Sequence, residues 1–220
     1  AAGRRRWEKF LHANKLWRPG TADRRLEVFA RAGEMVAGAA ATSAKQLLAA
    51  SLVRLLRTLQ CQLDAYRARI EALFASHPDH DIFGSLPGAG AKLAPRLLGE
   101  LGDRRDRFPS SLSLQCHAGT APVSFQSGQV HRVHMRRGTN SFLRNAVHQW
   151  CDHSRNQCVW AQAYYQSQRK RGKSHACALR CLAQRWLKIL WKMWQTRTRY
   201  DEAHHTHNQI THGSWVVKPA

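Results

Sequence analysis

One serine in this chain stands beside a run of cations. Ser127 precedes Gly128, and four arginines follow within a short distance, at Arg132, Arg136, Arg137 and Arg144. Guanidinium groups bind phosphate through paired hydrogen bonds, and glycine lets a nucleic-acid backbone approach closely. The pattern therefore suits a serine that attacks a phosphodiester while arginines stabilise the developing charge and His131 or His134 accepts the proton. The alternative is a serine that only caps or turns the chain, as most loop serines do.

A second phosphate-binding pattern lies upstream, in Leu86-Pro-Gly-Ala-Gly-Ala-Lys92. Gly88 and Gly90 permit positive φ and leave backbone N–H groups uncovered at the start of a helix, where Lys92 adds a charge. This arrangement is typical of a helix-hairpin-helix element, which holds the DNA backbone without reading its sequence. The alternative is an ordinary tight connection between two helices.

The overall charge favours a polyanionic partner. Among 220 residues, 35 are Lys or Arg and 14 are Asp or Glu, which gives a formal net charge of +21. The cations are spread along the whole chain, as expected for an extended nucleic-acid surface. No apolar run is long enough to span a bilayer and no signal peptide opens the chain, so we expect no membrane partner. The six cysteines are then expected to be reduced, in a cytoplasmic, nucleoid-associated protein.

Metal sites are not predicted within this chain. Two cysteine pairs and their neighbouring histidines can be drawn as a zinc site, but they lack the short Cys-x-x-Cys spacing of zinc knuckles: Cys151 and Cys158 with His148 and His153, and Cys177 with Cys181. Cysteines at these spacings on helices are more often buried as small apolar residues. The acidic residues Asp103, Asp106 and Asp152 each have cationic neighbours, which suits salt bridges better than magnesium.

The elements that position these residues are predicted to be mainly α-helical. We expect a helical arm over residues 1–80, a compact helical domain over 81–200 and a polar, His-rich tail over 201–220. In the arm, one helix runs from Arg4 to a stop at Pro19-Gly20, with Trp17 on its apolar face, and a second runs from Thr21 to Arg31. The small-residue stretch 33–41 is predicted to be a hinge or a loose helix.

A long helix is predicted from about Ala41 to Phe74. Its apolar residues alternate spacings of four and three, as in the heptads of a coiled coil, at Leu52, Leu56, Leu59, Leu63, Tyr66, Ile70 and Leu73. Such a seam requires a partner helix. Two partners remain open: a second copy of the chain, which would make it a homo-oligomer, or the first two helices of the same arm.

The domain that follows is predicted to hold several helices and one functional loop. Ser110 or Ser111 caps a short helix to His117, and Thr139 or Asn140 caps a helix from Phe142 to about Asn156. Between them, residues 123–136 form an irregular loop or a short hairpin. Further helices are expected over 159–169 and 173–197, the latter with an apolar stripe at Leu179, Leu182, Trp186, Ile189 or Leu190, and Met193. The tryptophans and tyrosines could stack on bases, but their helical spacing favours core packing.

The motifs in this order resemble the insertion-sequence one-ten family of transposases, the RNA-guided bridge recombinases with a DEDD domain and a serine domain. The resemblance covers essentially the whole chain. It rests on five stretches: Leu86-Pro-Gly-Ala-Gly-Ala-Lys, Ala118-Gly-Thr-Ala-Pro122, Gln126-Ser-Gly128, Arg136-Arg-Gly-Thr-Asn140 with Leu143-Arg144, and Ala178 to Trp194. It implies that Ser127 is the nucleophile that becomes joined to DNA. It also places Asn140 beside the arginines, among the residues expected to bind nucleic acid.

The resemblance also implies parts that this chain does not contain. The family's N-terminal domain carries four acids that hold Mg²⁺, and no residues here match it, so we expect this chain to be a C-terminal part with no cofactor of its own. A structured guide RNA is implied as a partner beside DNA, and the composite active site forms between protomers. The remaining alternative is a non-catalytic nucleic-acid-binding protein that uses the 87–92 turn.

Overall fold

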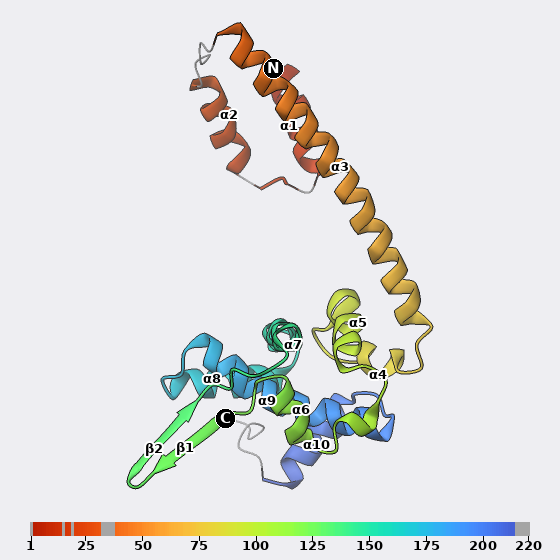
Figure 1. Ribbon diagram of the computed structural model, residues 1–220, viewed down its shortest axis with the longest axis vertical. Coiled ribbons are helices and arrows are strands. Elements are labelled where there is room, and N and C mark those ends of the chain that lie inside the picture. Colours follow the sequence, from red (N-terminus) through yellow and green to blue (C-terminus); the bar gives the residue numbers. More distant parts are fainter. Residues whose placement is uncertain (1, 15, 19, 32–37, 214–220) are drawn as a thin grey trace. The chain divides into compact units, whose positions relative to one another are not determined.

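The computed structural model describes residues 2–14, 16–18, 20–31 and 38–213 of the chain, and its fold is mainly α-helical, as predicted (Figure 1). The chain divides into two compact units, Ala1–Gln62 and Leu63–Ala220. The division precedes the boundary that the sequence suggests at residue 80. None of the described helices has the length and hydropathy of a membrane-spanning segment.

The first unit begins with helix α1 (Ala2–Ala13) and helix α2 (Thr21–Arg31). The prediction that the first helix extends over Trp17 is wrong, because Asn14 ends it: the Asn14 main chain and side chain both donate to Phe10 O, at 3.1 and 2.8 Å. Beyond this point the helical ladder shifts, because the Leu16 N–H donates to the Leu11 carbonyl five residues back, at 2.8 Å, a bond typical of a helix C-terminus. Trp17 instead stacks its ring on His12, with centroids 4.6 Å apart. The predicted stop at Pro19 lies outside the described residues, while α2 matches its predicted range.

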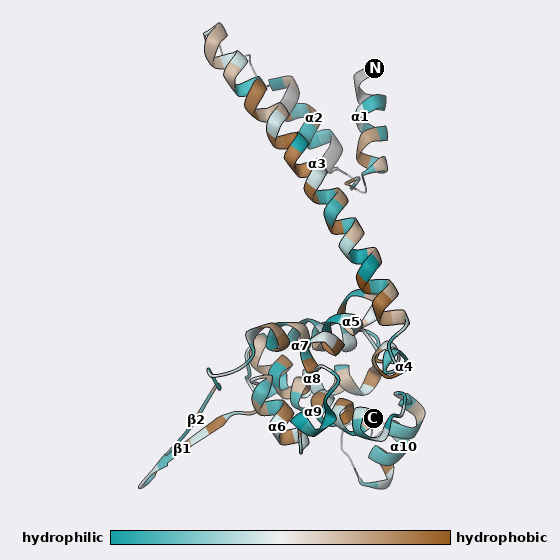
Figure 2. Ribbon diagram, turned by 45° about the vertical axis from the view of Figure 1, so that its right-hand side comes forward, coloured by the Kyte–Doolittle hydropathy of each residue, from teal (hydrophilic) through white to brown (hydrophobic). Residues whose placement is uncertain are grey.

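Helix α3 (Ala39–Ala75) confirms the predicted long helix, and none of its described residues is buried. The seven residues of the heptad seam are each about half exposed, from Leu63 at 49% to Tyr66 at 68%. Figure 2 shows hydrophobic positions recurring along this helix. The predicted hinge over 33–41 lies largely outside the described residues. The apolar seam of α3 is therefore exposed over its whole predicted length, and exposed apolar stripes of this kind commonly pack against another helix.

The second unit is built from short helices and one hairpin. Its elements are α4 (His80–Gly84), α5 (Gly90–Leu101), a 3₁₀ turn η1 (Arg105–Arg107), α6 (Ser111–His117), β1 (Val123–Ser127), β2 (Val130–His134), α7 (Ser141–Ser154), α8 (Val159–Lys170), α9 (His175–Thr196) and α10 (Glu202–Thr211). The alternative of a short hairpin over 123–136 is therefore confirmed.

Helix α9 is the central element of this unit and contacts α6, α7 and α8. Its predicted apolar stripe is buried, with Leu190 in the core and Ile189 at its edge. Trp186 packs between Trp150 of α7 and Trp160 of α8, with ring centroids 5.0 and 4.7 Å away. The prediction that these aromatics pack in the core is confirmed for the three tryptophans.

Side-chain caps set the starts of four helices. Ser110 and Ser113 form a capping box on α6, and Asn140 Oδ1 accepts the N–H groups of Phe142 and Leu143 at the start of α7. Ser174 caps α9, and Asp201 caps α10 by accepting the His204 N–H at 3.0 Å. Residues 201–220 were predicted to be a polar, His-rich tail, whereas 202–211 form α10; Asp201 followed by Glu202 is a helix-start pattern that this prediction missed.

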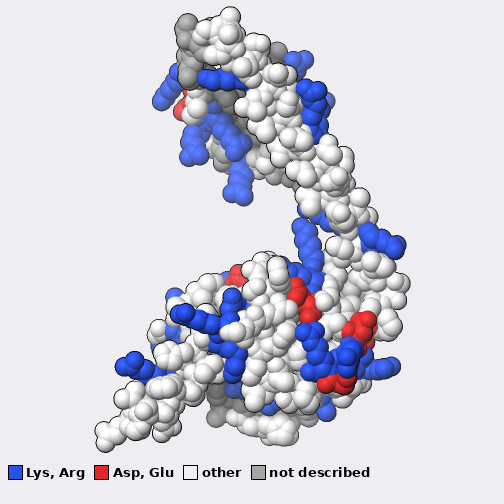
Figure 3. All heavy atoms as spheres, in the orientation of Figure 1, with Lys and Arg blue, Asp and Glu red and all other residues white. Residues whose placement is uncertain are grey.

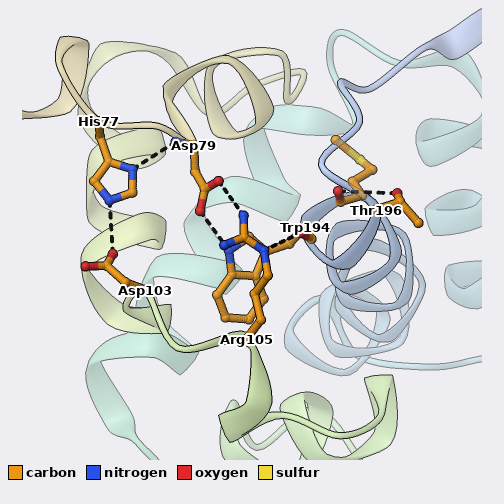
Figure 4. Close-up of polar contacts among 7 residues, drawn as sticks. His77, Asp79, Asp103, Arg105, Trp194 and Thr196 are labelled. Atoms are coloured by element: carbon orange, nitrogen blue, oxygen red, sulfur yellow. Dashed lines mark hydrogen bonds and ion pairs between the residues drawn. The ribbon is translucent and has the colours of Figure 1, made fainter.

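A buried carboxylate ties three segments together (Figure 4). The Asp79 side chain is 6% exposed; it accepts one hydrogen bond from Arg105 Nη2 and another from Trp194 Nε1 at 3.0 Å. Arg105 Nε in turn donates to the Trp194 carbonyl at 2.7 Å, and Gln195 Nε2 donates to the Arg105 carbonyl at 3.0 Å. The segment before α4, the η1 turn and the end of α9 are thus held at one point.

Loss of the Arg105 guanidinium should destabilise the second unit. In Arg105→Met the Asp79 carboxylate stays buried without its charged partner, which typically costs about 3–5 kcal/mol. Urea unfolding followed by tryptophan fluorescence measures the change. Arg104→Met is the control, because Arg104 pairs with Asp106 at the surface, where their side chains are 80% and 67% exposed, and such pairs contribute little. Equal midpoints for the two variants would contradict this account.

Candidate nucleic-acid interface

Ser127 lies at the tip of the β1–β2 hairpin. Val123 pairs with His134 and Ser127 pairs with Val130, so two residues, Gly128 and Gln129, close the turn. Gly128 has φ +55°, and Gln129 is not among the described non-glycine residues with positive φ. Glycine at the first central position is the requirement of a type II′ turn, which suits the twist of a hairpin. The predicted Ser-Gly pair is therefore built into the turn itself.

The strand register decides which predicted residues share a face. Ser127 shares its face with Val130 opposite and with Arg132, which pairs with Phe125. His131 pairs with Gln126 on the other face. His134 shares the face of Ser127 but lies four residues along β2 from Val130, roughly 13 Å at 3.3 Å per residue. The hairpin thus places an arginine near the serine, and neither histidine reaches its hydroxyl.

Both faces of the hairpin are open. All ten strand residues are exposed, including Phe125 at 56% and Val133 at 58%. Within the described part of the chain, no hydrogen bond or ion pair involves the Ser127 hydroxyl or the Arg132 guanidinium. A two-stranded hairpin is only marginally stable by itself. The chemistry at its tip therefore requires a partner that supplies the missing contacts.

The root of the hairpin, in contrast, is firmly anchored. The residues before β1, from Ala118 to Ala121, are buried. Gln184 of α9 donates to the Thr120 carbonyl at 2.6 Å, and its own carbonyl accepts from Gln115 Nε2 at 2.7 Å. Gly119 has φ +70°, and a Cβ there would come within 2.7 Å of the Thr139 methyl group. The two ends of the hairpin are thereby held against the helical body.

The predicted phosphate ligands after β2 have different surroundings. Arg137 is exposed, whereas Arg136 Nε is buried with no acceptor among the described residues. A buried donor without a partner is costly, so an anion here would supply a missing acceptor. Arg144 Nη1 donates weakly to Thr139 Oγ1 at 3.4 Å. Asn140 is occupied: besides capping α7, its Nδ2 donates to Glu100 Oε2 at 3.0 Å.

His117 joins the hairpin root to α7. Its carbonyl accepts the Asn140 N–H at 3.0 Å, and its ring Nε2 lies 3.3 Å from Arg107 Nη2. Burial lowers the pKa of His117, and the charge of Arg107 lowers it further, while Glu100 opposes them. A neutral imidazole can accept the hydrogen bond from Arg107. The ring therefore serves as a structural acceptor at neutral pH.

The 87–92 turn combines a structural half with an open half. The Gly88 N–H donates to Gln157 Oε1 at 2.7 Å, and Trp150 Nε1 donates to the Pro87 carbonyl at 2.9 Å. By contrast, the N–H groups of Gly90, Ala91 and Lys92 have no acceptor within the described residues. They open α5 beside the exposed Lys92. The turn thus packs through Gly88 and presents donors through Gly90 and Lys92.

Charge around these elements is almost entirely of one sign. From Arg107 to Tyr200 the sequence holds sixteen Lys and Arg but a single acid, Asp152. That acid pairs with Arg155 Nε at 2.7 Å. Figure 3 shows Lys and Arg spread over the visible face and Asp and Glu at only a few places. This scarcity of acids can be counted in the sequence itself, but the charge prediction used only the total charge and the spread of the cations.

The described residues do not provide a site for a catalytic metal. No group of three or more His, Cys, Asp or Glu lies close enough among them to hold an ion. Cys151 is buried and the pKa of its thiol is raised well above the usual value by burial, as suits an apolar core residue. The Mg²⁺ that the resemblance implies is expected in the N-terminal acidic domain and not among the residues of this chain.

Residues 80–166 match the family model for the transposases of IS116, IS110 and IS902. This range contains the 87–92 turn, the hairpin with Ser127 and the start of α7, which together hold all the predicted site residues. The chain therefore carries a domain of the IS116/IS110/IS902 transposase family, as the resemblance predicted.

Three curated relatives extend the similarity beyond this range. The chain is 38% identical over 157 residues to the mini-circle transposase sequence of IS117 from Streptomyces coelicolor, covering 71% of this chain and 37% of the relative. It is 32% identical over 202 residues to an IS110 43.6 kDa protein of the same organism, covering 91% and 49%. An IS900 42 kDa protein of Mycobacterium paratuberculosis is 30% identical over 169 residues, covering 72% and 41%. The chain thus spans half or less of the length of these relatives.

The two glycines of the turn should respond differently to alanine. A Cβ on Gly88 would lie 2.5 Å from the Ser154 nitrogen, whereas a Cβ on Gly90 meets nothing within 4 Å. Both have positive φ, which costs about 1–2 kcal/mol for alanine, and overpacking adds about 1–3 kcal/mol at Gly88 alone. We expect Gly88→Ala to lower the free energy of unfolding clearly more than Gly90→Ala in urea titrations. Similar losses would argue against close packing of the turn on α7.

Proposed function

We propose that this chain is the DNA-binding, serine-bearing part of an IS110-type transposase and takes part in DNA transposition. The observation that carries the proposal is the position of Ser127: an exposed serine at a glycine turn, beside Arg132, within the family-matched range. An exposed tip with an anchored root is a suitable way to bring a nucleophile to a DNA backbone. The scarcity of acids around it favours the approach of phosphate.

Ser127 is proposed to act as the nucleophile of strand exchange. Its oxygen would form a bond to phosphorus while the bond from phosphorus to a deoxyribose oxygen breaks, and the serine proton leaves as that oxygen gains one. Arg132 on the same face would stabilise the charge that develops on the phosphate oxygens. Because neither His131 nor His134 lies beside the hydroxyl, the proton acceptor is proposed to come from another protein part.

That other part is proposed to be the acidic domain that the resemblance implies, with its Mg²⁺, and the full assembly is proposed to include a structured guide RNA. The partial coverage of the relatives, from 37% to 49% of their length, supports a partner segment for this chain. On this proposal the hairpin residues are exposed in this chain because the acidic domain supplies the remaining groups of the active site. The experiments below therefore supply the acidic domain of a relative.

Ser127→Ala should abolish recombination when the acidic domain and donor and target DNA are supplied, while DNA binding stays within about twofold. A plasmid recombination assay measures the first effect and an electrophoretic shift measures the second. Ser124→Ala is the matched control, because Ser124 lies on the same strand but faces the other side, opposite Val133. Normal recombination products from Ser127→Ala would overturn the proposal.

A second candidate function is a non-catalytic nucleic-acid-binding protein that uses the 87–92 turn. The free N–H groups at the start of α5 favour it, since they can hold a phosphate with Lys92. It predicts that Lys92→Glu weakens salt-sensitive binding, while Ser127→Ala has no effect in any assay. The Ser127 variant thus separates the two functions.

We also propose that α3 pairs with a second copy of the chain. The evidence is the half-exposed heptad seam, of which no described residue is buried. Seven apolar side chains at alternating spacings of four and three form the kind of stripe that two helices bury against each other.

Leu59→Glu should raise the dissociation constant of the dimer at least about tenfold, because it places a charge in the middle of the seam. Sedimentation velocity across a concentration series measures this. Leu47→Glu is the matched control, since Leu47 is also exposed, at 66% against 54% for Leu59, but lies off the seam. A wild-type chain that is monomeric at all concentrations would disprove pairing.

A further inference from the structure

A groove of about 960 Å³ lies in the second unit, lined by residues of α8, α9, α10 and the segment between α9 and α10. None of the residues predicted to bind nucleic acid lines it. Its walls come from two separate stretches of sequence, Trp160 and Tyr164 on α8 and the segment from Arg185 of α9 to His212 after α10. This volume is at the upper end of the range for small-ligand pockets.

One wall of the groove carries a row of cations. Arg185, Lys188 and Lys192 follow one another at spacings of three and four on α9, so they share one helical face and extend over roughly 10 Å. All three are exposed. Arg199 adds a fourth charge at the far end, with only a long contact of 4.0 Å to Asp81.

Carboxylates do not neutralise this wall. Asp201 is the single acid among the lining residues of the groove, and its Oδ1 is used to cap α10 by accepting the His204 N–H. Among the described residues, no ion pair involves Lys188 or Lys192. The row therefore presents net positive charge to whatever enters.

The floor of the groove is aromatic. Tyr164 and Tyr200 are half-buried, and each offers part of a ring to the groove; the Arg185 guanidinium lies over the Tyr164 ring at 5.4 Å. The His205 ring lies 4.9 Å from Trp160 and 6.2 Å from Tyr200. Burial raises the pKa of Tyr200 and lowers that of His205, so both rings are uncharged at neutral pH. The groove therefore offers flat, neutral rings for stacking beside a row of cations, whereas the tip of the hairpin is polar.

We infer that this groove binds a single-stranded segment of nucleic acid. Phosphates would follow the α9 cations while bases stack on Tyr164, Tyr200 and the Arg185 plane, which is the combination that sequence-tolerant single-strand sites use. Paired bases keep their faces within the duplex and cannot reach such a floor. An acidic peptide would satisfy the cations but leave the rings unused. The inference does not depend on Ser127 being a nucleophile, because no hairpin residue lines the groove.

The test measures the binding of fluorescent oligonucleotides of about twelve nucleotides to the full chain by anisotropy at fixed salt. Lys188→Ala/Lys192→Ala should weaken single-strand binding by roughly tenfold or more, because two phosphate contacts are lost. Lys45→Ala/Lys170→Ala removes the same charge from exposed positions outside the groove and should change binding by no more than about twofold. Equal effects of the two double variants would overturn the inference.

A second arm tests the aromatic floor. Tyr164→Leu keeps an apolar side chain but removes the ring, and should weaken binding by roughly fivefold or more. An abasic oligonucleotide of the same length should bind wild type and Tyr164→Leu alike; if wild type binds it as tightly as the normal strand, stacking is excluded. Parallel DNA and RNA strands show which of the two the groove prefers.

A photo-crosslinking experiment locates the bound oligonucleotide on the protein directly, without relying on changes in affinity. An oligonucleotide that contains 5-iodouracil should crosslink to peptides from α8 or from 200–212 and lose that crosslink in Lys188→Ala/Lys192→Ala. Crosslinks confined to the hairpin or the 87–92 turn would overturn the inference. Failure of the groove would leave the recombination assay of Ser127→Ala unaffected, so the two proposals can fail separately.

Discussion

The buried Asp79 carboxylate is the interaction on which the second unit depends. The carboxylate accepts hydrogen bonds from Arg105 and Trp194, which lie 26 and 115 positions further along the chain. A charge at 6% exposure is tolerated only when its hydrogen-bonding capacity is filled, so the three segments must come together at the same time. The end of α9 is thereby set, and with it the turn through Arg199 and Tyr200 that forms one edge of the groove. Packing of Trp186 against Trp150 and Trp160 then fills the rest of the core.

In this arrangement the residues that anchor each proposed binding surface differ from the residues that face solvent. The root of the hairpin, the packed half of the 87–92 turn and the floor of the groove all rest on α7 or α9, whereas the charged and reactive groups point outward with few partners. Gln184 holds the hairpin root from the same helix that carries Lys188 and Lys192 on its exposed face. One helix therefore positions both of the surfaces that are proposed to bind nucleic acid. Binding would cost little conformational entropy at the anchored root of the hairpin. It would cost more at the exposed tip, because the tip residues would become ordered only on contact with a partner.

Much of this could be predicted from the sequence, because local signals determine it. The heptad spacing predicted α3. Ser110 and Asn140 were each one of two candidate caps, and a short hairpin around Gly128 was one of two alternatives. The rest depends on contacts between distant residues. The hydrogen bond from the Gly88 N–H to Gln157 and the walls of the groove depend on tertiary packing. The orientation of His131 away from Ser127 depends on the register of the strands. The end of α1 was missed because Trp17 continues the apolar spacing of that helix, although its ring stacks on His12 from outside the helix.

The scarcity of acids between Arg107 and Tyr200 has a consequence for the folded state itself. Sixteen cations with a single carboxylate among them repel one another, and this repulsion opposes the compact state whenever the protein is alone. A polyanion on the surface relieves the repulsion, so it acts on folding as well as on recognition. Screening by salt would relieve it in part, while the same salt competes with the polyanion for the cations. On the proposed function nucleic acid would supply the missing negative charge, and the free protein carries this repulsion in full.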